Sequence, residues 1–291
     1  MNSTIRILHL SDTHVPAGGS ALDGSDPLAA LDRLLTDVRH IEALDLVLVT
    51  GDIADDGSAD GCIAVRRRVA RFAAARGAAQ VYLPGNHDTR EGFAEAFGSG
   101  HLSASGRDLS SASFDGPESA AVSHHRGVRV VTLDSVVPGE VHGELGAAQL
   151  DWLRGVLSRP APQGTIIALH HPPIPFVESP YLSGVGLRNP RALEEAIAGT
   201  DVRGVLCGHF HLPAGGFLGS VPVWVSAGVA TRIDATAPRD TVRFATESGA
   251  TVVGLTHGGG PYFHVLQPHE GERNGQTFTL APELADATNG R

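Results

Sequence analysis

Carboxylate, imidazole and amide side chains follow several apolar runs of the sequence, each at the point where the run ends. The segments are "HLSDTH" from His9, "TGD" from Thr50, "PGNHD" from Pro84, "ALHHP" from Ala168 and "CGHFH" from Cys207. Oxygen and nitrogen donors of these types are the ligands that divalent and trivalent first-row metals take. The candidate metal ligands are Asp12, His14, Asp52, Asn86, His170, His209 and His211.

These seven donors are too many for one ion, but they suit two ions that share one carboxylate. Two metals about 3.5–4 Å apart can clamp a phosphoryl group and present a bridging hydroxide for in-line attack. Taken alone, Asp12 or Asp52 would more often be a helix cap or a turn residue. The whole set, rather than any single member, indicates metal chemistry.

The spacing of the candidate ligands carries further information. The ligands in Asp12-Thr13-His14 and in His209-Phe210-His211 are two residues apart, so an extended backbone would place both side chains of a pair on one face. Gly51 and Gly208 each precede a ligand. We expect the backbone to turn sharply there or to pass close to a metal centre.

Apolar runs predict strands, and helical spacing predicts helices between several of them. Hydrophobic residues recur every three or four positions around Leu31, Val69 and Leu153, which is typical of amphipathic helices. Alternating strands and helices indicate an α/β domain with a largely parallel central sheet. Ligand sites in such sheets lie beyond the carboxyl ends of the strands, so the polar residues can converge there. The predicted strands cover residues 5–10, 44–50, 80–83, 128–133, 165–169 and 202–206.

Beyond His211 the pattern changes to strand-like runs without helices between them, over residues 221–268. We interpret these runs as completion of the sheet plus an edge hairpin, within one domain over residues 1–265. The remaining residues, 266–291, are expected to form a polar tail or an arm that packs on a second subunit. The Ser/Gly-rich stretch 99–120 predicts a loop.

The composition of the chain argues against nucleic acid as a partner, against a disulfide framework and against a membrane helix. The 291-residue chain has a formal charge of −10, which disfavours nucleic acid, since binding its phosphate backbone relies on basic surface. The two cysteines, Cys62 and Cys207, provide neither a disulfide framework nor a CxxC zinc motif. No apolar run approaches the roughly 20 residues of a membrane helix, and the first residues lack a long apolar segment. We expect a cytoplasmic protein without stable membrane association.

Five motifs in order give the sequence a family resemblance. Asp-x-His, Gly-Asp, Gly-Asn-His-Asp, His-His-Pro and Gly-His-x-His, over about residues 5–212, resemble the calcineurin-like metallophosphoesterase superfamily. The segments "HLSDTHV", "TGDIADDG", "VPGEVHGELGAAQLDWL" and "ALHHPPIP" are similar to those of the class III cyclic-nucleotide phosphodiesterases. The resemblance implies an αββα sandwich of central mixed sheets flanked by helices, with a dinuclear metal site at the strand C-terminal ends.

The resemblance also implies roles for individual residues. One metal would take Asp12, His14 and His211, and the other would take Asn86, His170 and His209, with Asp52 bridging. His87 would not be a ligand; it would contact the substrate phosphate as a charge-stabilising donor or as the acid for the leaving oxygen.

Other polar residues receive weaker predictions. We hypothesise that Asp55, three residues after Asp52, orients His87. We interpret Asp88 either as a residue that supports the metal ligands without binding the metal, or as a turn-forming residue. His171 is expected to be structural. Among the remaining histidines, His142 is the strongest candidate for a further substrate contact, and the others are expected on the surface or in loops: His124, His125, His257, His264 and His269.

Departures from other branches of the superfamily narrow the substrate. No Tyr follows Asp52 as in purple acid phosphatases, and the Gly-Asn-His-Asp motif differs from the Gly-Asn-His-Glu of serine/threonine phosphatases. The first choice is metal-dependent hydrolysis of 3′,5′-cyclic AMP or GMP to the 5′-monophosphate, by attack of a hydroxide that bridges the metals. The alternatives are a broader phosphodiesterase acting on glycerophosphodiesters or 2′,3′-cyclic nucleotides, and a metal-binding protein with little turnover.

The ligand set suits Fe, Mn, Zn or Co, with Fe and Mn favoured. The resemblance suggests a homodimer built from the C-terminal strands and loops.

Overall fold

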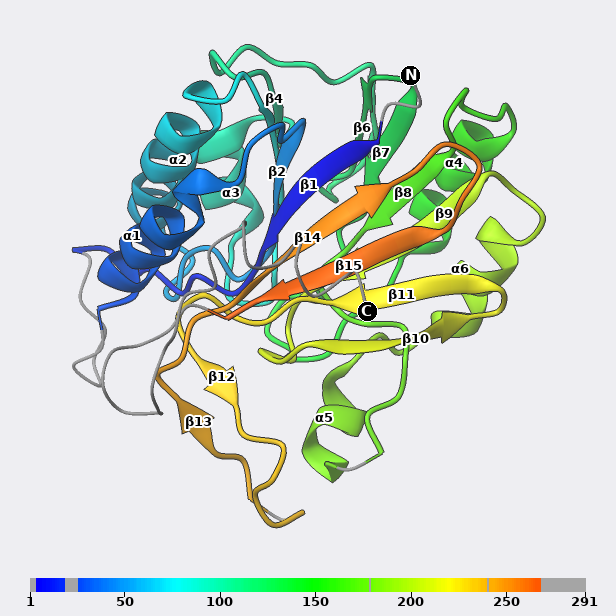
Figure 1. Cartoon of the computed structure of the whole chain (residues 1–291). Helices are drawn as coiled ribbons and strands as arrows, with labels where there is room; N and C mark the ends of the chain where they lie inside the picture. Colours follow the sequence, from blue (N-terminus) through cyan, green and yellow to red (C-terminus); the bar gives the residue numbers. More distant parts are fainter. Residues whose placement is uncertain (1–3, 19–25, 178, 240, 268–291) are drawn as a thin grey trace, which may run out of the picture.

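Two β-sheets lie face to face, and helices cover both outer faces (Figure 1). The computed structural model describes residues 4–18, 26–177, 179–239 and 241–267. Sheet A has the strand order β15-β14-β1-β2-β3-β4, and sheet B has the order β10-β11-β9-β8-β7-β6-β5. The expected sandwich of mixed sheets is confirmed.

Sheet A is parallel only in its centre, where β1, β2 and β3 run in the same direction. Its outer strands pair antiparallel to their neighbours. Its strands are β1 (Ile5–Leu10), β2 (Leu46–Thr50), β3 (Ala79–Leu83), β4 (His101–Leu102), β14 (Ala250–Leu255) and β15 (Pro261–Leu266).

Sheet B has a parallel centre of β11, β9, β8 and β7, and antiparallel strands on either side. The alternation of strands and helices pointed to one largely parallel sheet, whereas the chain forms two. After α3 the chain does not make another strand–helix crossover within sheet A. It forms the edge strand β4 of sheet A and then continues into β5 and β6, which belong to sheet B. Its strands are β5 (Ala112–Ser113), β6 (Ala121–His125), β7 (Val128–Thr132), β8 (Thr165–Ala168), β9 (Val202–Cys207), β10 (Ala214–Leu218) and β11 (Val221–Val225).

The sheets are buried on both faces, which explains their continuous apolar runs. In β2, Leu48 packs between the two sheets, while Val47 and Val49 pack under the helices. Each such side chain contributes about 2 kcal/mol by leaving water. The helices are α1 (Pro27–Asp37), η1 (Val38–His40), α2 (Ala59–Ala74) and α3 (Arg90–Phe97) over sheet A, with α4 (Ala147–Leu157), α5 (Pro180–Val185) and α6 (Pro190–Ile197) packed with sheet B.

Two of these helices begin directly after the candidate ligand loops. Ser58 caps α2 by accepting a hydrogen bond from the Gly61 amide at 3.2 Å, and Thr89 caps α3 by accepting from the Gly92 amide at 3.1 Å. Such caps satisfy amide groups that have no partner inside the helix. They fix where the loops after β2 and β3 end. None of the helices in the described ranges is long and apolar enough to cross a membrane.

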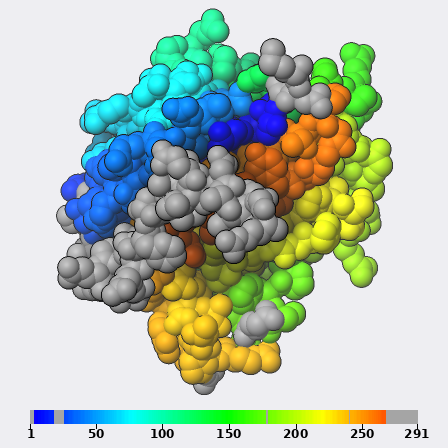
Figure 2. Space-filling view, in the orientation of Figure 1, coloured from blue at the N-terminus to red at the C-terminus, as the bar shows by residue number. Residues whose placement is uncertain are grey.

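The C-terminal strands complete sheet A, as the sequence predicts. β14 pairs antiparallel with β1, and β15 forms the edge of the sheet beside it. Outside both sheets, β12 (Arg232–Ile233) and β13 (Phe244–Ala245) form a two-stranded ribbon. Figures 1 and 2 show this ribbon beside α5 at one end of the molecule, and Leu182 and Ile233 share one apolar cluster there.

The predictions for the Ser/Gly-rich stretch and for His125 need correction. Residues 99–120 contain the short strands β4 and β5, and His101 within them is fully buried. Its ring nitrogens lie 2.6 Å from Ser123 Oγ and 2.9 Å from Thr132 Oγ1. His125 is also buried, with Nε2 2.7 Å from Ser123 Oγ. These hydrogen bonds satisfy buried imidazoles that sequence composition had assigned to a loop and to the surface.

Candidate active site

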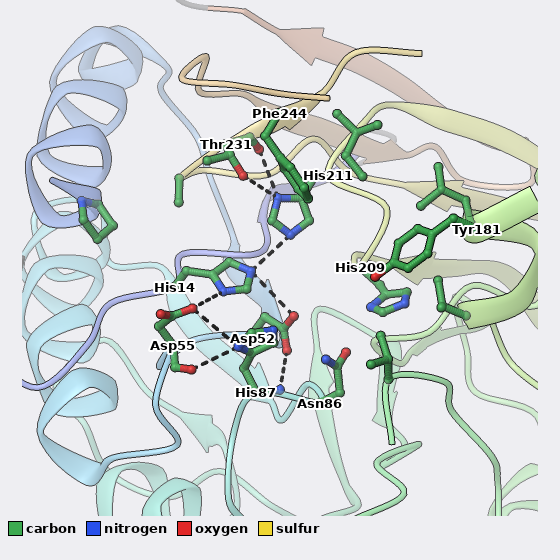
Figure 3. A pocket seen from close by; sticks show the side chains of 16 residues that line it. His14, Asp52, Asp55, Asn86, His87, Tyr181, His209, His211, Thr231 and Phe244 are labelled. Atoms are coloured by element: carbon green, nitrogen blue, oxygen red, sulfur yellow. Dashed lines mark hydrogen bonds and ion pairs between the residues drawn. The ribbon is translucent and has the colours of Figure 1, made fainter. Parts of the chain in front are cut away.

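The loops that follow β1, β2, β3, β8 and β9 meet at one end of the sandwich and bring the candidate ligands together. Donor atoms of Asp12, His14, Asp52 and His211 lie within 4.8 Å of one another. His14 Nε2 lies 3.1 Å from His211 Nε2, and His211 Nε2 lies 3.4 Å from Asp12 Oδ1. We call these residues, without the shared Asp52, the first half of the site; Figure 3 shows His14 and His211 of this half beside Asp52.

The second half consists of Asn86, His170 and His209. His209 Nδ1 lies 3.2 Å from His170 Nε2. Asn86 Oδ1 is buried without a hydrogen-bond partner among the described residues. Asp52 joins the halves, because its Oδ2 lies 3.6 Å from His14 Nε2 and 3.3 Å from His170 Nε2.

These distances suit metal coordination. Nitrogen ligands bound to one ion at about 2.1 Å lie about 3.0–3.4 Å apart in octahedral or tetrahedral geometry. The two imidazole pairs, at 3.1 and 3.2 Å, fall in that interval. A buried amide oxygen without a partner is costly unless it binds a cation. The donor set therefore fits two metal ions, one in each half.

The backbone conformation of the ligands differs from the prediction. Asp12 and His14 have φ angles of 54° and 44°, and His209 and His211 have 71° and 49°. Asp52 has 47°. The expected extended backbone is wrong for both pairs, although their side chains still converge. Left-handed residues other than glycine cost about 1 kcal/mol or more each and cluster at functional sites.

Hydrogen bonds between the loops maintain these unusual conformations. The His14 amide donates to the Asp52 carbonyl at 2.9 Å, and the His209 amide donates to the Asp12 carboxylate at 3.1 Å. Glycine allows the loops to approach closely, because a Cβ at Gly208 would lie 1.8 Å from Ser11 Oγ. Gly51 has φ 86°. The sequence-based expectations for both glycines are confirmed.

Three imidazoles are oriented by a hydrogen bond from the ring nitrogen that faces away from the site. His14 Nδ1 donates to Asp55 Oδ1 at 3.0 Å, and His170 Nδ1 donates to the Thr50 carbonyl at 2.7 Å. His211 Nδ1 donates to Thr231 Oγ1 at 2.8 Å. In each ring Nε2 is left to face the other donors, which is how metal-binding histidines are usually held.

The charges in the site call for a cation. Although burial disfavours its ionised form, His170 and His14 hold the pKa of Asp52 well below its usual range. Burial lowers the pKa of His170, but Asp52 outweighs it and raises that pKa to about 9. Burial and the neighbouring His170 lower the pKa of His209 to about 3. The ionised aspartates therefore need positive charge nearby. Protonation can place that charge on only some of the imidazoles, whereas bound metal ions would balance the charge of every aspartate in the site.

A profile of the calcineurin-like phosphoesterase family matches residues 5–213, the part of the chain that carries every donor described above. The chain belongs to the calcineurin-like phosphoesterases. The match confirms the family resemblance that the five sequence motifs indicate.

Relatives of this phosphoesterase share both sequence and fold. It is 37% identical over 236 residues to a cAMP/cGMP dual specificity phosphodiesterase of Mycobacterium tuberculosis, covering 79% of this chain and 69% of that one. It is 32% identical over 210 residues to the 3′,5′-cyclic adenosine monophosphate phosphodiesterase CpdA of Escherichia coli, covering 71% and 70%. A dimetal phosphatase from Danio rerio has the same fold, with a TM-score of 0.56, 14% identity and coverage of 89% and 98%.

In this calcineurin-like phosphoesterase His87 is not part of either half. Its side chain is 42% exposed, and Nδ1 lies 3.0 Å from the Asp55 carbonyl oxygen and 3.4 Å from the Asp55 carboxylate. The predicted contact between Asp55 and His87 is thus present. The same carboxylate lies closer to His14, at 3.0 Å, a second role that sequence reasoning missed.

Other residues of the motifs have structural partners. Asp88 accepts hydrogen bonds from the amides of Ile53, Ala54 and Gly85, which ties the loop after β2 to the loop after β3. Burial, together with Asp52, raises the pKa of Asp88 to about 6.

Two further histidines were expected near the site. Both ring nitrogens of His171 have partners, Ser135 Oγ at 2.8 Å and the Val141 carbonyl at 3.2 Å. A ring nitrogen of His171 also lies within 4.8 Å of donor atoms of His170 and His209, so its structural role stays a prediction. His142 lies 3.5 Å from Glu140 and is not among the described residues that line the cavity.

A cavity of about 440 Å³ lies above the donors. Polar side chains form its floor, among them His14, Asp52 and Asn86. Apolar side chains form its walls, and only Val141 among them lies in a segment that carries the family resemblance. They are Pro27, Val141, Tyr181, Leu182, Val185, Ala230, Ile233 and Phe244.

Proposed function

We propose that this phosphoesterase hydrolyses 3′,5′-cyclic nucleotides to 5′-monophosphates in a metal-dependent reaction. The observation that carries the proposal is Asp52 Oδ2, which lies within 3.6 Å of an imidazole from each half, on the floor of a cavity large enough for a nucleotide. The names of the relatives support the choice of substrate.

We assign Asp12, His14 and His211 to one metal ion and Asn86, His170 and His209 to the other, with Asp52 shared. Bound metal ions would withdraw charge from the phosphoryl oxygens and lower the pKa of water. The donor chemistry suits Fe, Mn, Zn or Co, of which we favour Fe and Mn.

His87 acts on the substrate from the exposed side of the floor. Its Nδ1 is held by the Asp55 carbonyl, so Nε2 is available to the cavity. In the reaction water adds to phosphorus, the P–O3′ bond breaks, and O3′ needs a proton because an alkoxide is a poor leaving group. A His87 protonated on both nitrogens donates that proton or a hydrogen bond. Asn86 is the second proposed substrate contact, and His142 remains a predicted one.

A broader phosphodiesterase is the second candidate function. It is favoured by the exposure of His87, which leaves the floor accessible to small esters such as glycerophosphodiesters and 2′,3′-cyclic nucleotides. A metal-binding protein without turnover is the third, and it has no specific observation in its favour.

We further propose one catalytic domain over residues 1–265 and a tail over 266–291, a homodimer through the C-terminal strands and loops, and a cytoplasmic location. The described residues end at 267, so most of the proposed tail lies outside them.

Hydrolysis of bis(p-nitrophenyl) phosphate tests the enzymatic proposal. We expect chelation to abolish it and Mn²⁺ to restore it. Comparing kcat/KM for 3′,5′-cAMP, 2′,3′-cAMP and glycerophosphoethanolamine then separates the two enzymatic candidates. His87→Ala should lower kcat by about 100-fold or more, while the exposed His124→Ala should leave it unchanged. Metal-loaded protein without activity on any of these esters would refute the proposal.

A further inference from the structure

Two exposed aromatic rings form part of the walls of the cavity. Tyr181 is 50% exposed and Phe244 is 56% exposed, and both line the cavity above the donors. Figure 3 shows Tyr181 reaching from α5 toward His209, with Phe244 over His211. The Phe244 ring centroid lies 5.9 Å from that of His211, at 80° between the planes.

Both rings are carried by segments outside the two sheets, and these segments are fixed in place. Leu182, next to Tyr181, and Ile233 of the ribbon are buried in the same apolar cluster. Arg239, in the segment between β12 and β13, donates a hydrogen bond to the Val177 carbonyl at 3.1 Å, ahead of α5. The rings therefore stand at defined positions above the floor.

The floor and the walls of the cavity suit different parts of one ligand. The match to the family covers residues 5–213, which hold all the donors and Tyr181, whereas Phe244 lies beyond it. The floor suits a phosphoryl group, whichever ester carries it. Large exposed apolar side chains beside a polar floor suit a ligand with a planar, weakly polar part joined to a phosphate. A glycerol or ethanolamine ester has no such part.

We propose that Tyr181 and Phe244 form a nucleobase subsite that makes the enzyme prefer nucleotide esters over esters without a base. The inference rests on the proposed function, since it takes the phosphoryl group to lie on the floor. Stacking of a base on an aromatic side chain is worth about 5- to 150-fold in affinity when tested by alanine substitution. The preference should be tolerant of base identity, because every base presents a π-face.

Product binding to the Mn²⁺-loaded protein tests the subsite separately from turnover. Calorimetry would compare 5′-AMP with ribose 5-phosphate, which has the same phosphate and sugar but no base. We expect 5′-AMP to bind at least about tenfold more tightly. Phe244→Ala and Tyr181→Ala should each remove most of that advantage while changing ribose 5-phosphate affinity by less than about twofold.

Two controls separate stacking from damage to the fold. Tyr181→Phe retains the ring and should retain the preference. Phe217→Ala removes an aromatic ring that is 72% exposed on β10 and does not line the cavity, so it should change neither affinity.

The subsite would be refuted if the unaltered protein bound 5′-AMP and ribose 5-phosphate equally, or bound neither. It would also be refuted if the preference for 5′-AMP persisted in both Phe244→Ala and Tyr181→Ala. Failure to hydrolyse 3′,5′-cAMP by a protein that still prefers 5′-AMP would instead refute the proposed reaction and leave the subsite supported.

Discussion

Buried histidines occur in two kinds of surroundings in this protein, at the candidate metal site and in the interior of the sandwich. At the site, burial alone would lower the pKa of His14 and His170, but aspartates reverse the effect and raise both, whereas the pKa values of His209 and His211 stay lowered by burial. In the interior, burial lowers the pKa of His9 and His101 to about 3. Hydroxyl groups are the side-chain partners of these interior rings.

The difference shows what decides the role of a buried imidazole. A neutral ring whose partners are hydroxyl groups needs no charge, and at His101 both ring nitrogens have such a partner. A ring beside two or three carboxylates lies in a negative field that a proton or a metal ion can balance. The same residue type is thus structural in one region and a proposed metal ligand in the other, and the neighbouring carboxylates distinguish the two.

The largest effect is expected when the negative charge of Asp52, which lies next to both halves of the site, is removed. Asp52→Asn preserves the size of the side chain but removes its charge, and we expect kcat on bis(p-nitrophenyl) phosphate to fall at least about thousandfold. Elemental analysis after dialysis should show fewer than two metal ions per chain. A variant that keeps both ions and a tenth of the activity would contradict the shared role of Asp52.

Asp55→Ala tests the carboxylate that supports the first half alone. We expect metal affinity in that half to fall about 10- to 100-fold, because His14 loses the partner of its Nδ1. The second half should be unaffected, since His170 is held by a main-chain carbonyl. Metal content and titration of metal-free protein would measure this. Asp56→Ala, which removes the adjacent exposed carboxylate, is the matched control. Full kcat and two tightly held ions in Asp55→Ala would refute the idea.

The interior histidines should make the fold sensitive to acid. The folded pKa of His101, about 3, lies below its ordinary value of 6.5, so between these values the unfolded chain binds more protons. Stability is therefore lost as the pH falls below about 6.5, by about 2 kcal/mol from His101 at about pH 5.

Denaturant unfolding with chelator present measures this loss. His101→Gln should lose about 2 kcal/mol less than the unaltered protein between about pH 7 and pH 5. His124→Gln, on the exposed face of β6, should keep the original pH dependence. Equal slopes for all three proteins would show that His101 is not held neutral by burial.

The smallest expected effect concerns Thr231, whose hydroxyl accepts from His211 Nδ1. Thr231→Val removes one hydrogen bond worth about 1 kcal/mol, so metal affinity in the first half should fall about fivefold. The Thr231 carbonyl, 3.2 Å from the same nitrogen, limits the loss. Titration of metal-free protein gives the value, with the exposed Thr236→Val as control. If Thr231→Val lowered metal affinity more than Asp55→Ala does, the hydroxyl of Thr231 would matter more to the first half than the carboxylate of Asp55, contrary to the prediction.

The candidate ligands were predictable from sequence because each follows an apolar run, and parallel strands bring such ends together. Asp52 and His170 illustrate this, since both lie at the carboxyl ends of central strands. The left-handed backbone at Asp12 and His209 was not predictable, because only hydrogen bonds between loops distant in sequence maintain it. The spacing of residues in the sequence does not reveal hydrogen bonds between distant loops.

Features that depend on tertiary packing were missed in the same way. Strand β10 was not predicted, because Gly215 and Gly216 have low strand propensity and only pairing with β11 holds them. His101 lies in a Ser/Gly-rich stretch whose composition indicates a loop. Tyr181 and Phe244 belong to no periodic pattern, and only the folding of α5 and the β12–β13 ribbon over the floor brings them to one cavity.

The position of β14 has a consequence for how the enzyme is made. Asp12 and His14 lie in the loop that follows β1, and one of the two neighbours of β1, β14, is separated from it by most of the chain. While the chain emerges from the ribosome, that edge of β1 stays bare until residues 250–255 have been synthesised. A nascent chain that has reached residue 213 already contains every candidate metal donor, but it still lacks the strand that pairs with this edge of β1. We therefore expect the catalytic floor to be among the last parts to mature.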